Sequence, residues 1–279
     1  MIQPKITVII GPTASGKSGL AIRLAQKYDG CVVNADSMQI YRDLSIISAR
    51  PMPDEMNGIP HLLYGYLDAW TQGTVQDWLS RVIPLLKEKK NPVLVGGTGL
   101  YLSSLINGIN EIPDIDPAIR ESVRQMPLTD IKKQVIDCPF TDPQRLMRAL
   151  EVQLSTGKPL SYFQKQPKKK LTDIDFHVIF INPDREQLYE NCEKRFYQMI
   201  NSGGIEEVAH LLTLKPTGGV LKAIGVPEII SYIQGHISKE DMCRQAILAT
   251  RHYAKRQVTW FKHQIQSDTV IKTINELKI

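Results

Sequence analysis

Short apolar runs alternate with amphipathic stretches along the first third of the chain. The runs at 6–10, 31–33 and 92–95 are rich in Val, Ile and Leu, whereas 16–28 and 75–90 carry apolar residues at helical spacing. Strands that alternate with helices form a parallel sheet with crossover helices. We therefore predict an α/β fold with a parallel sheet and crossover helices.

The middle of the chain has a different pattern. From residue 113 to about 170, helical signals occur without strand runs. The Asp-Pro pairs at 116–117 and 142–143 predict helices over 118–126 and 144–155, because Asp caps a helix and Pro suits its first turn. This segment is predicted to be a helical insertion.

The α/β pattern then returns. A buried strand is predicted at 176–181, followed by a helix up to residue 199. A long helix is predicted from 239 to about 264, and a last short strand at 269–273. We expect residues 1–112 and 172–279 to form one core domain, and residues 113–171 to form the inserted helical domain.

Composition is that of an ordinary globular protein. The chain has 279 residues, of which 42% are hydrophobic and 23% charged, so it can build a normal core. No apolar run approaches the roughly 18 residues that a membrane span needs, and the first run is too short for a signal peptide. We expect a cytoplasmic protein without a membrane partner, and a monomer.

Cysteines and net charge add little to this picture. Cys31, Cys138, Cys192 and Cys243 lie far apart and form no C-x-x-C pair, so a zinc site is not expected. The net charge of +5 is compatible with a polyanionic partner but does not require one.

One motif carries specific chemistry. The sequence G-x-x-x-x-G-K-S stands between an apolar strand and a helix, which is the context of a phosphate-binding loop (P-loop). Its backbone N–H groups can surround phosphate oxygens, the lysine adds a positive charge, and the final hydroxyl can bind Mg²⁺. The loop comprises Gly11, Pro12, Thr13, Ala14, Ser15, Gly16, Lys17 and Ser18.

The acid that usually accompanies a P-loop in nucleotide hydrolases is missing. Such enzymes hold Mg²⁺ with an Asp at the end of a second strand, but the strand at 92–95 runs into Gly-Gly-Thr-Gly. Asp36 follows the predicted strand at 31–33 and Thr98 follows the strand at 92–95, and the carboxyl ends of parallel strands meet at one crevice. We expect Gly11, Asp36 and Thr98 to converge, although Asp36 and Thr98 could also serve only as helix or turn caps.

An ordered set of motifs resembles the bacterial tRNA dimethylallyltransferases, also called tRNA isopentenyltransferases. The set comprises the P-loop, Asp-Ser-Met-Gln-Ile-Tyr-Arg at 36–42, Gly-Ile-Pro-His at 58–61, Gly-Gly-Thr-Gly-Leu-Tyr at 96–101, Asp-Pro-Gln-Arg-Leu-Met-Arg-Ala-Leu-Glu at 142–151, and Thr-Arg-His-Tyr-Ala-Lys-Arg-Gln-Val-Thr-Trp-Phe-Lys at 250–262. The resemblance implies transfer of a dimethylallyl group from dimethylallyl diphosphate to N6 of the adenosine 3′-adjacent to the anticodon, with Mg²⁺ as cofactor. The core would be a P-loop domain with a basic C-terminal helix, and the insertion would contact the tRNA anticodon arm.

The resemblance also implies roles for individual residues. Asp36 matches the catalytic aspartate, Thr98 a position near the reacting groups, and Lys17 and Arg195 the cations that stabilise the leaving diphosphate. Gln39 matches a position that reads the edge of the flipped base. The implied tRNA contacts are Asp36, Ser37, Met38, Gln39, Thr98, Arg120, Gln144, Arg145, Leu146, Met147, Arg148, Lys255, Arg256, Trp260 and Lys262, and the implied metal ligand is Ser18.

The chemistry of the residues agrees with this implication. Loss of diphosphate from an allylic carbon leaves positive charge on the carbon and negative charge on the departing oxygens, which a P-loop with its cations can stabilise. A carboxylate near the attacking amine can accept its proton. For Arg195, a position on a solvated helix face remains the alternative.

The C-terminal helix has the composition of an RNA-binding surface. Residues 242–267 include no Asp or Glu, while five cations lie among three aromatic side chains. Cations and aromatics together suit a phosphate backbone with stacked bases, but an ordinary solvated face remains open. Trp260 either stacks on RNA or packs against the core. The lysines at 168–170 are interpreted as a solvated loop.

Three rival functions remain. A small-molecule kinase would need the carboxylate that is missing, and a non-catalytic RNA-binding protein would leave the P-loop and Asp36 unused. Prenyl transfer to free adenine nucleotides would not require the insertion or the basic helix. Whether ATP binds the P-loop is left open, as are the roles of Ser48, Arg50 and Val226, where the sequence departs from the usual family pattern.

Overall fold

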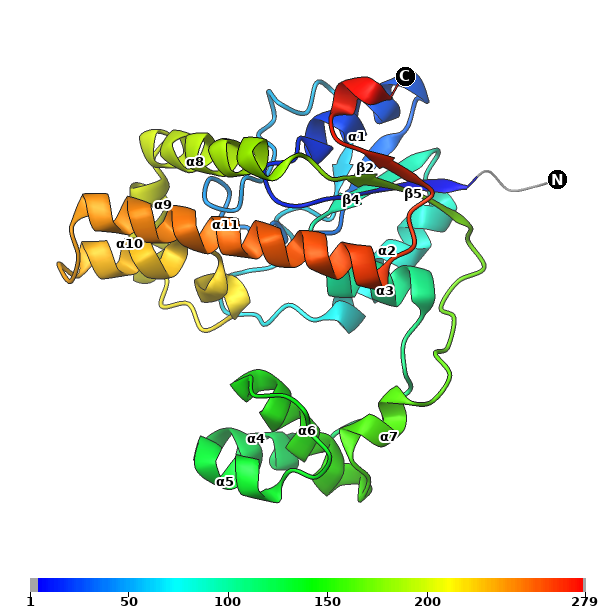
Figure 1. Ribbon diagram of the computed structural model, residues 1–279, viewed down its shortest axis with the longest axis vertical. Coiled ribbons are helices and arrows are strands. Elements are labelled where there is room, and N and C mark those ends of the chain that lie inside the picture. Colours follow the sequence, from blue (N-terminus) through cyan, green and yellow to red (C-terminus); the bar gives the residue numbers. More distant parts are fainter. Residues whose placement is uncertain (1–4, 278–279) are drawn as a thin grey trace. The chain divides into compact units, whose positions relative to one another are not determined.

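The computed structural model describes residues 5–277 and contains one six-stranded, fully parallel sheet (Figure 1). The strand order is β3-β2-β4-β1-β5-β6, so the P-loop strand β1 lies between β4 and β5. This confirms the predicted α/β class. The strands are β1 (Ile6–Ile10), β2 (Cys31–Asn34), β3 (His61–Leu62), β4 (Pro92–Gly96), β5 (Phe176–Ile181) and β6 (Thr269–Ile271).

The chain divides into two compact units. The α/β unit comprises the residues up to 106 and from 172 onward, and the helical unit comprises Asn107–Leu171. Residues 107–112 were expected in the core domain, but Ile112 packs against the buried Ile115, Val152 and Phe163 of the helical unit. The helical unit consists mainly of α4 (Pro117–Gln125), α5 (Leu128–Gln134), α6 (Pro143–Thr156) and α7 (Leu160–Gln164).

Helices cover both faces of the sheet. On one face, the apolar side of α1 (Lys17–Lys27) packs against alternate strand residues such as Ile9, Ile179 and Ile181. On the other, Phe180 contacts Phe261 of α11 (Lys239–Gln264), with ring centroids 5.9 Å apart. Burial on both sides explains why the strands are continuous apolar runs.

A separate hydrophobic cluster joins the C-terminal helices to the loop after β2. It includes buried residues of that loop and of four helices. These helices are α8 (Arg185–Asn201), α9 (Gly204–Thr213), α10 (Val226–Ile233) and α11. The 3₁₀ turn η1 (Gly219–Lys222) adds Val220 to the cluster, and a second 3₁₀ turn, η2 (Ile274–Glu276), follows β6.

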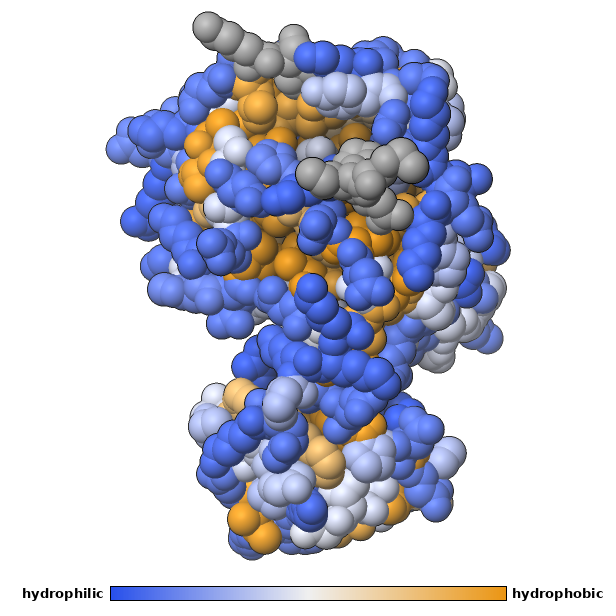
Figure 2. Space-filling model, turned by 90° about the vertical axis from the view of Figure 1, so that its right-hand side faces the viewer, coloured by the Kyte–Doolittle hydropathy of each residue, from blue (hydrophilic) through white to orange (hydrophobic). Residues whose placement is uncertain are grey.

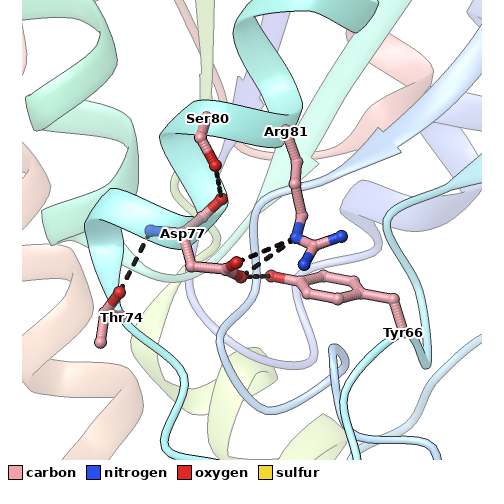
Figure 3. A network of polar contacts seen from close by, with 5 residues as sticks. All are labelled: Tyr66, Thr74, Asp77, Ser80 and Arg81. Atoms are coloured by element: carbon pink, nitrogen blue, oxygen red, sulfur yellow. Dashed lines mark hydrogen bonds and ion pairs between the residues drawn. The ribbon is translucent and has the colours of Figure 1, made fainter.

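A polar network fixes the start of α2 (Val75–Glu88) (Figure 3). The Asp77 carboxylate accepts hydrogen bonds from the Tyr66 hydroxyl at 3.1 Å and from Arg81 Nε at 3.1 Å, and Thr74 Oγ1 caps the helix by accepting from Asp77 N. The next residue, Trp78, is fully buried, and its indole N–H donates to the Asn34 carbonyl at 2.8 Å. This network therefore anchors a helix that supports the end of β2.

Most predicted elements are found at the predicted places. The short strand β3 and the helices α5 and α7 were not predicted, because each is too brief to show a periodic pattern. The helix α3 (Gly99–Asn107) follows β4. None of the helices within residues 5–277 is long and apolar enough to span a bilayer.

The surface of both units is mixed in hydropathy (Figure 2). On the face drawn in Figure 2, hydrophilic residues form much of the outline of each unit, and hydrophobic residues show in patches on both.

Candidate functional site

The P-loop wraps tightly at the carboxyl end of β1. Gly16 has a left-handed backbone with φ 83°, which glycine adopts without strain, and α1 begins at the next residue. Lys17 Nζ donates to the Pro12 carbonyl at 3.1 Å. The Ser15 side chain is buried, and its Oγ has no hydrogen-bond partner among the described residues. A buried hydroxyl without a partner is costly, so this loop is suited to a polar ligand.

A buried asparagine positions Asp36. Asn34, at the last position of β2, is fully buried. Its Oδ1 accepts from Asp36 N at 2.9 Å, and its Nδ2 donates to the carbonyls of Asp36 and Leu63 at 3.1 and 3.0 Å. The Asp36 carboxylate uses Oδ1 to accept from Met38 N at 2.9 Å, whereas Oδ2 accepts no hydrogen bond from any described residue. One carboxylate oxygen is thus held in place while the other is available.

The turn after β4 closes against the segment around Asp36. Thr98 Oγ1 accepts from Ser37 N at 2.8 Å and lies 3.1 Å from Ser37 Oγ. At Gly96, a Cβ atom would stand only 2.1 Å from the Ala35 carbonyl oxygen, so only glycine allows this approach. The structure therefore brings Thr98 into contact with Ser37, the residue that follows Asp36.

A cavity of about 340 Å³ opens beside these strand ends within the α/β unit. Thr13, Asp36, Arg195 and Arg256 bring polar groups to its wall. Arg195 on α8 is half-buried there, so it does not lie on a solvated outer face. The apolar part of the wall includes Ile47, Phe196, Met199, Ala223 and Ile224.

Burial sets the charges of this site. It lowers the pKa of Lys17 to about 8, with Arg195 acting in the same direction and Asp36 opposing it. Burial also lowers the pKa of the Arg195 guanidinium, opposed by Cys192 and Asp36. Two cations and one carboxylate therefore share a poorly solvated space, which an added polyanion would stabilise.

Three residues of this site were not predicted from the sequence. Asn34 positions Asp36, Tyr253 lines the cavity, and Gln257 is a buried amide that contacts the P-loop. Burial, and then Asp36, raises the pKa of Tyr253, which therefore stays a neutral phenol. The polar Asn ending an otherwise apolar strand was the one sequence signal available, because a polar residue there needs a partner.

The predicted RNA contacts of the α/β unit differ in exposure. Lys255, Arg256 and Lys262 are exposed on α11. Trp260 packs its ring over Gly99, where a Cβ atom would stand 2.3 Å from the indole Cε3. Gln39 uses both N–H groups of its amide on the Ser48 and Ala49 carbonyls, so a base edge could meet only its oxygen.

In the helical unit, the predicted contacts divide into surface and core. Arg120, Gln144 and Arg145 are exposed, and Arg148 pairs with Glu151 at 3.3 Å. Leu146 was expected to touch RNA, but its side chain is 3% exposed in the hydrophobic core of this unit. Met147 is partly buried against the same core. We therefore withdraw Leu146 as an RNA contact.

Sequence comparisons identify relatives over nearly the whole chain. A family model described as IPP transferase matches residues 39–264. A tRNA dimethylallyltransferase from Erythrobacter litoralis is 42% identical, over 95% of this chain and 90% of that protein. Another from Rickettsia felis is 40% identical, over 99% of this chain and 96% of that protein.

Solved structures agree with these relatives. A eukaryotic dimethylallyltransferase acting on tRNA has a TM-score of 0.78 and 28% identity, covering 93% of this chain and 70% of that chain. A tRNA isopentenylpyrophosphate transferase from Bacillus halodurans has a TM-score of 0.72 and 29% identity, covering 96% of this chain and 89% of that chain.

Proposed function

Because the chain belongs to the IPP transferase family of tRNA dimethylallyltransferases, we propose that it transfers a dimethylallyl group from dimethylallyl diphosphate to tRNA. The acceptor is N6 of the adenosine 3′-adjacent to the anticodon, and inorganic diphosphate is released. The observation that carries this proposal is the meeting of Asp36, Thr13 of the P-loop and Arg195 at one cavity, with the half-buried Lys17 electrostatically coupled to Asp36 and Arg195.

The leaving group is the first half of the chemistry. The P-loop N–H groups, Ser15 Oγ, Lys17 and Arg195 bind the diphosphate and stabilise its charge as the C1–O bond breaks. The protein places these groups before the substrate arrives, so little reorganisation is needed during the reaction. Protonated Lys17 is favoured once the diphosphate is bound, because the anion opposes the effect of burial.

The nucleophile is the second half. The lone pair of the N6 amine forms the new N6–C1 bond, and the amine proton passes to Asp36 Oδ2, the carboxylate oxygen that accepts no hydrogen bond from the described residues. Thr98, which is hydrogen-bonded to Ser37, lies beside this carboxylate segment. The base must leave its stack to enter such a cavity.

The site is suited to a Mg²⁺ ion that binds together with the diphosphate. Ser18 is half-buried on the first turn of α1, and no cluster of three or more His, Cys, Asp or Glu side chains able to hold a metal lies within residues 5–277. The residues present would therefore hold Mg²⁺ through Ser18, with the diphosphate oxygens and water as further ligands. When bound, the ion neutralises part of the charge on the leaving group.

The tRNA is assigned to cations and neighbouring residues of both units. We propose that Lys255, Arg256 and Lys262 of α11 bind phosphates, and that Arg120, Gln144, Arg145, Met147 and Arg148 contact the anticodon arm. We also propose that the reaction takes place in the cytosol and that the enzyme acts as a monomer, which sedimentation at working concentration would check.

The decisive experiment is a product assay. The protein is incubated with dimethylallyl diphosphate, Mg²⁺ and unmodified tRNA, and the nucleosides are analysed by mass spectrometry. We expect N6-dimethylallyladenosine in tRNA, and none with Asp36→Asn. Product from AMP but not from tRNA would favour transfer to free nucleotides, and steady ADP formation from ATP would favour a kinase.

A further inference from the structure

A single buried amide connects two loops of the site. Gln257 on α11 is 6% exposed. Its Oε1 accepts from the backbone N–H of Thr13 at 2.8 Å, and its Nε2 donates to the Gly97 carbonyl at 2.9 Å. Each end of the side chain therefore holds the backbone of a different loop.

Both of these loops face the reacting groups. Thr13 belongs to the P-loop and lines the cavity. Gly97 directly precedes Thr98 and lies beside Asp36, since a Cβ atom at Gly97 would stand 3.3 Å from Asp36 Oδ2. The amide thus spans from the loop assigned to the leaving group to the turn beside the proposed base.

The surrounding sequence is fitted to this amide. A Cβ atom at Gly97 would stand 2.4 Å from Gln257 Nε2, so any larger residue would displace the side chain. Trp260, one helical turn after Gln257 on α11, covers Gly99, which belongs to the same loop as Gly97. The helix therefore contacts the turn after β4 at two glycines.

The amide group itself is required by the two hydrogen bonds. Thr13 offers a donor and Gly97 an acceptor, so the bridging side chain must accept at one end and donate at the other. A glutamate could accept from Thr13, but when ionised it would direct a negative oxygen at the Gly97 carbonyl. A methionine would fill the space without making either bond.

We propose that Gln257 is a positioning residue, which holds the P-loop and the Gly96–Gly99 turn at the separation needed for the diphosphate to face the attacking nitrogen. This proposal rests on the proposed function. Gln257 itself touches neither reactant; it acts through the backbone of Thr13 and Gly97.

The test compares Gln257→Met with Gln245→Met, a matched change at an exposed position of the same helix. At a temperature well below the Tm of both variants, we expect Gln257→Met to lower kcat and weaken the binding of inorganic diphosphate by roughly 10- to 100-fold each, as for other residues that orient a direct ligand. Gln245→Met should match the wild type in both measurements. Diphosphate binding is measured by calorimetry and does not depend on product formation. This measurement therefore tests the proposal even if the wild type fails to prenylate tRNA.

A second variant, Gln257→Glu, separates positioning from packing. Its carboxyl group, when protonated, can donate to the Gly97 carbonyl and accept from Thr13 N, whereas the ionised form cannot donate. The activity of Gln257→Glu relative to the wild type should therefore rise as pH falls from about 8 to 5.5, which a purely structural defect would not produce. Wild-type kcat and diphosphate affinity in Gln257→Met, together with a lowered Tm, would overturn the proposal and leave Gln257 a core residue.

Discussion

The site around Asp36 and the P-loop differs from the helical unit in how far its charged residues are buried and held by hydrogen bonds. At the strand ends, Asp36 is held by Asn34 and Met38 N, and Lys17 and Arg195 are largely buried. In the helical unit, Arg120 and Arg145 are exposed, and the Arg145 guanidinium lies over the Phe140 ring at 5.0 Å. Bond-making needs groups fixed before the substrate arrives, whereas attraction of a phosphate backbone needs only accessible charge.

The largest effect is expected at the proposed base. Asp36→Asn keeps an oxygen for the Met38 N–H but cannot take the amine proton, so the single-turnover rate should fall by roughly 1,000-fold with little change in tRNA affinity. Asp29→Asn, at an exposed residue paired with Lys90, is the control. Activity above a tenth of the wild type would exclude this role for Asp36.

Next comes the buried arginine. Arg195→Met should lower the rate by roughly 100-fold, because one preorganised positive charge on the leaving group is lost. Lys194→Met changes the neighbouring residue, which is exposed and paired with Glu190, and should leave the rate unchanged. Equal rates for the two variants, measured by rapid quench, would return Arg195 to a structural role.

Replacing the buried Lys17 should lower activity and raise the stability of the fold. The pKa of Lys17 falls from its ordinary 10.5 to about 8, so the charged form is disfavoured in the fold, and Lys17→Met should raise the free energy of unfolding by at most about 3 kcal/mol. The gain should be complete below pH 8 and fade as pH rises toward 10.5, where the unfolded chain also loses the proton. Urea unfolding without diphosphate or Mg²⁺, with Lys27→Met as the control, measures this change. A lower free energy of unfolding for Lys17→Met than for the wild type would contradict the prediction.

The smallest effect per residue is expected at the exposed cations. Arg145→Gln in one unit and Lys255→Gln in the other should each reduce the slope of log affinity against log salt by roughly one, while the rate at saturating tRNA stays constant. Lys168→Gln, in the loop interpreted as solvated, should leave the slope unchanged. A salt titration in which only one of the two variants differs would confine the RNA surface to that unit.

The sequence predicted the parts of this site that depend on local pattern. The P-loop between β1 and α1, and Asp36 and Thr98 at neighbouring strand ends, follow from motif spacing and parallel strand order. Gln257 escaped prediction because its partner is distant in the chain: it bonds to Gly97, 160 positions away. Asn34 bonds to the nearby Asp36, but no sequence motif shows which backbone groups a buried amide will hold. Leu146 was misassigned because a motif match does not tell which face of α6 is buried.

The hydrogen bond between Gln257 and Thr13 also bears on when the enzyme becomes complete during synthesis. It joins residues 244 positions apart, and β6 joins the sheet only after α11 has been made. The nascent chain therefore carries a finished P-loop motif long before the helix that braces it, and Phe180 lacks its cover from Phe261 until the same moment. Contacts of such long range make assembly late and slow. Ribosome-stalled chains that end before Gln257 should bind no diphosphate, so this activity should appear only once α11 has been synthesised.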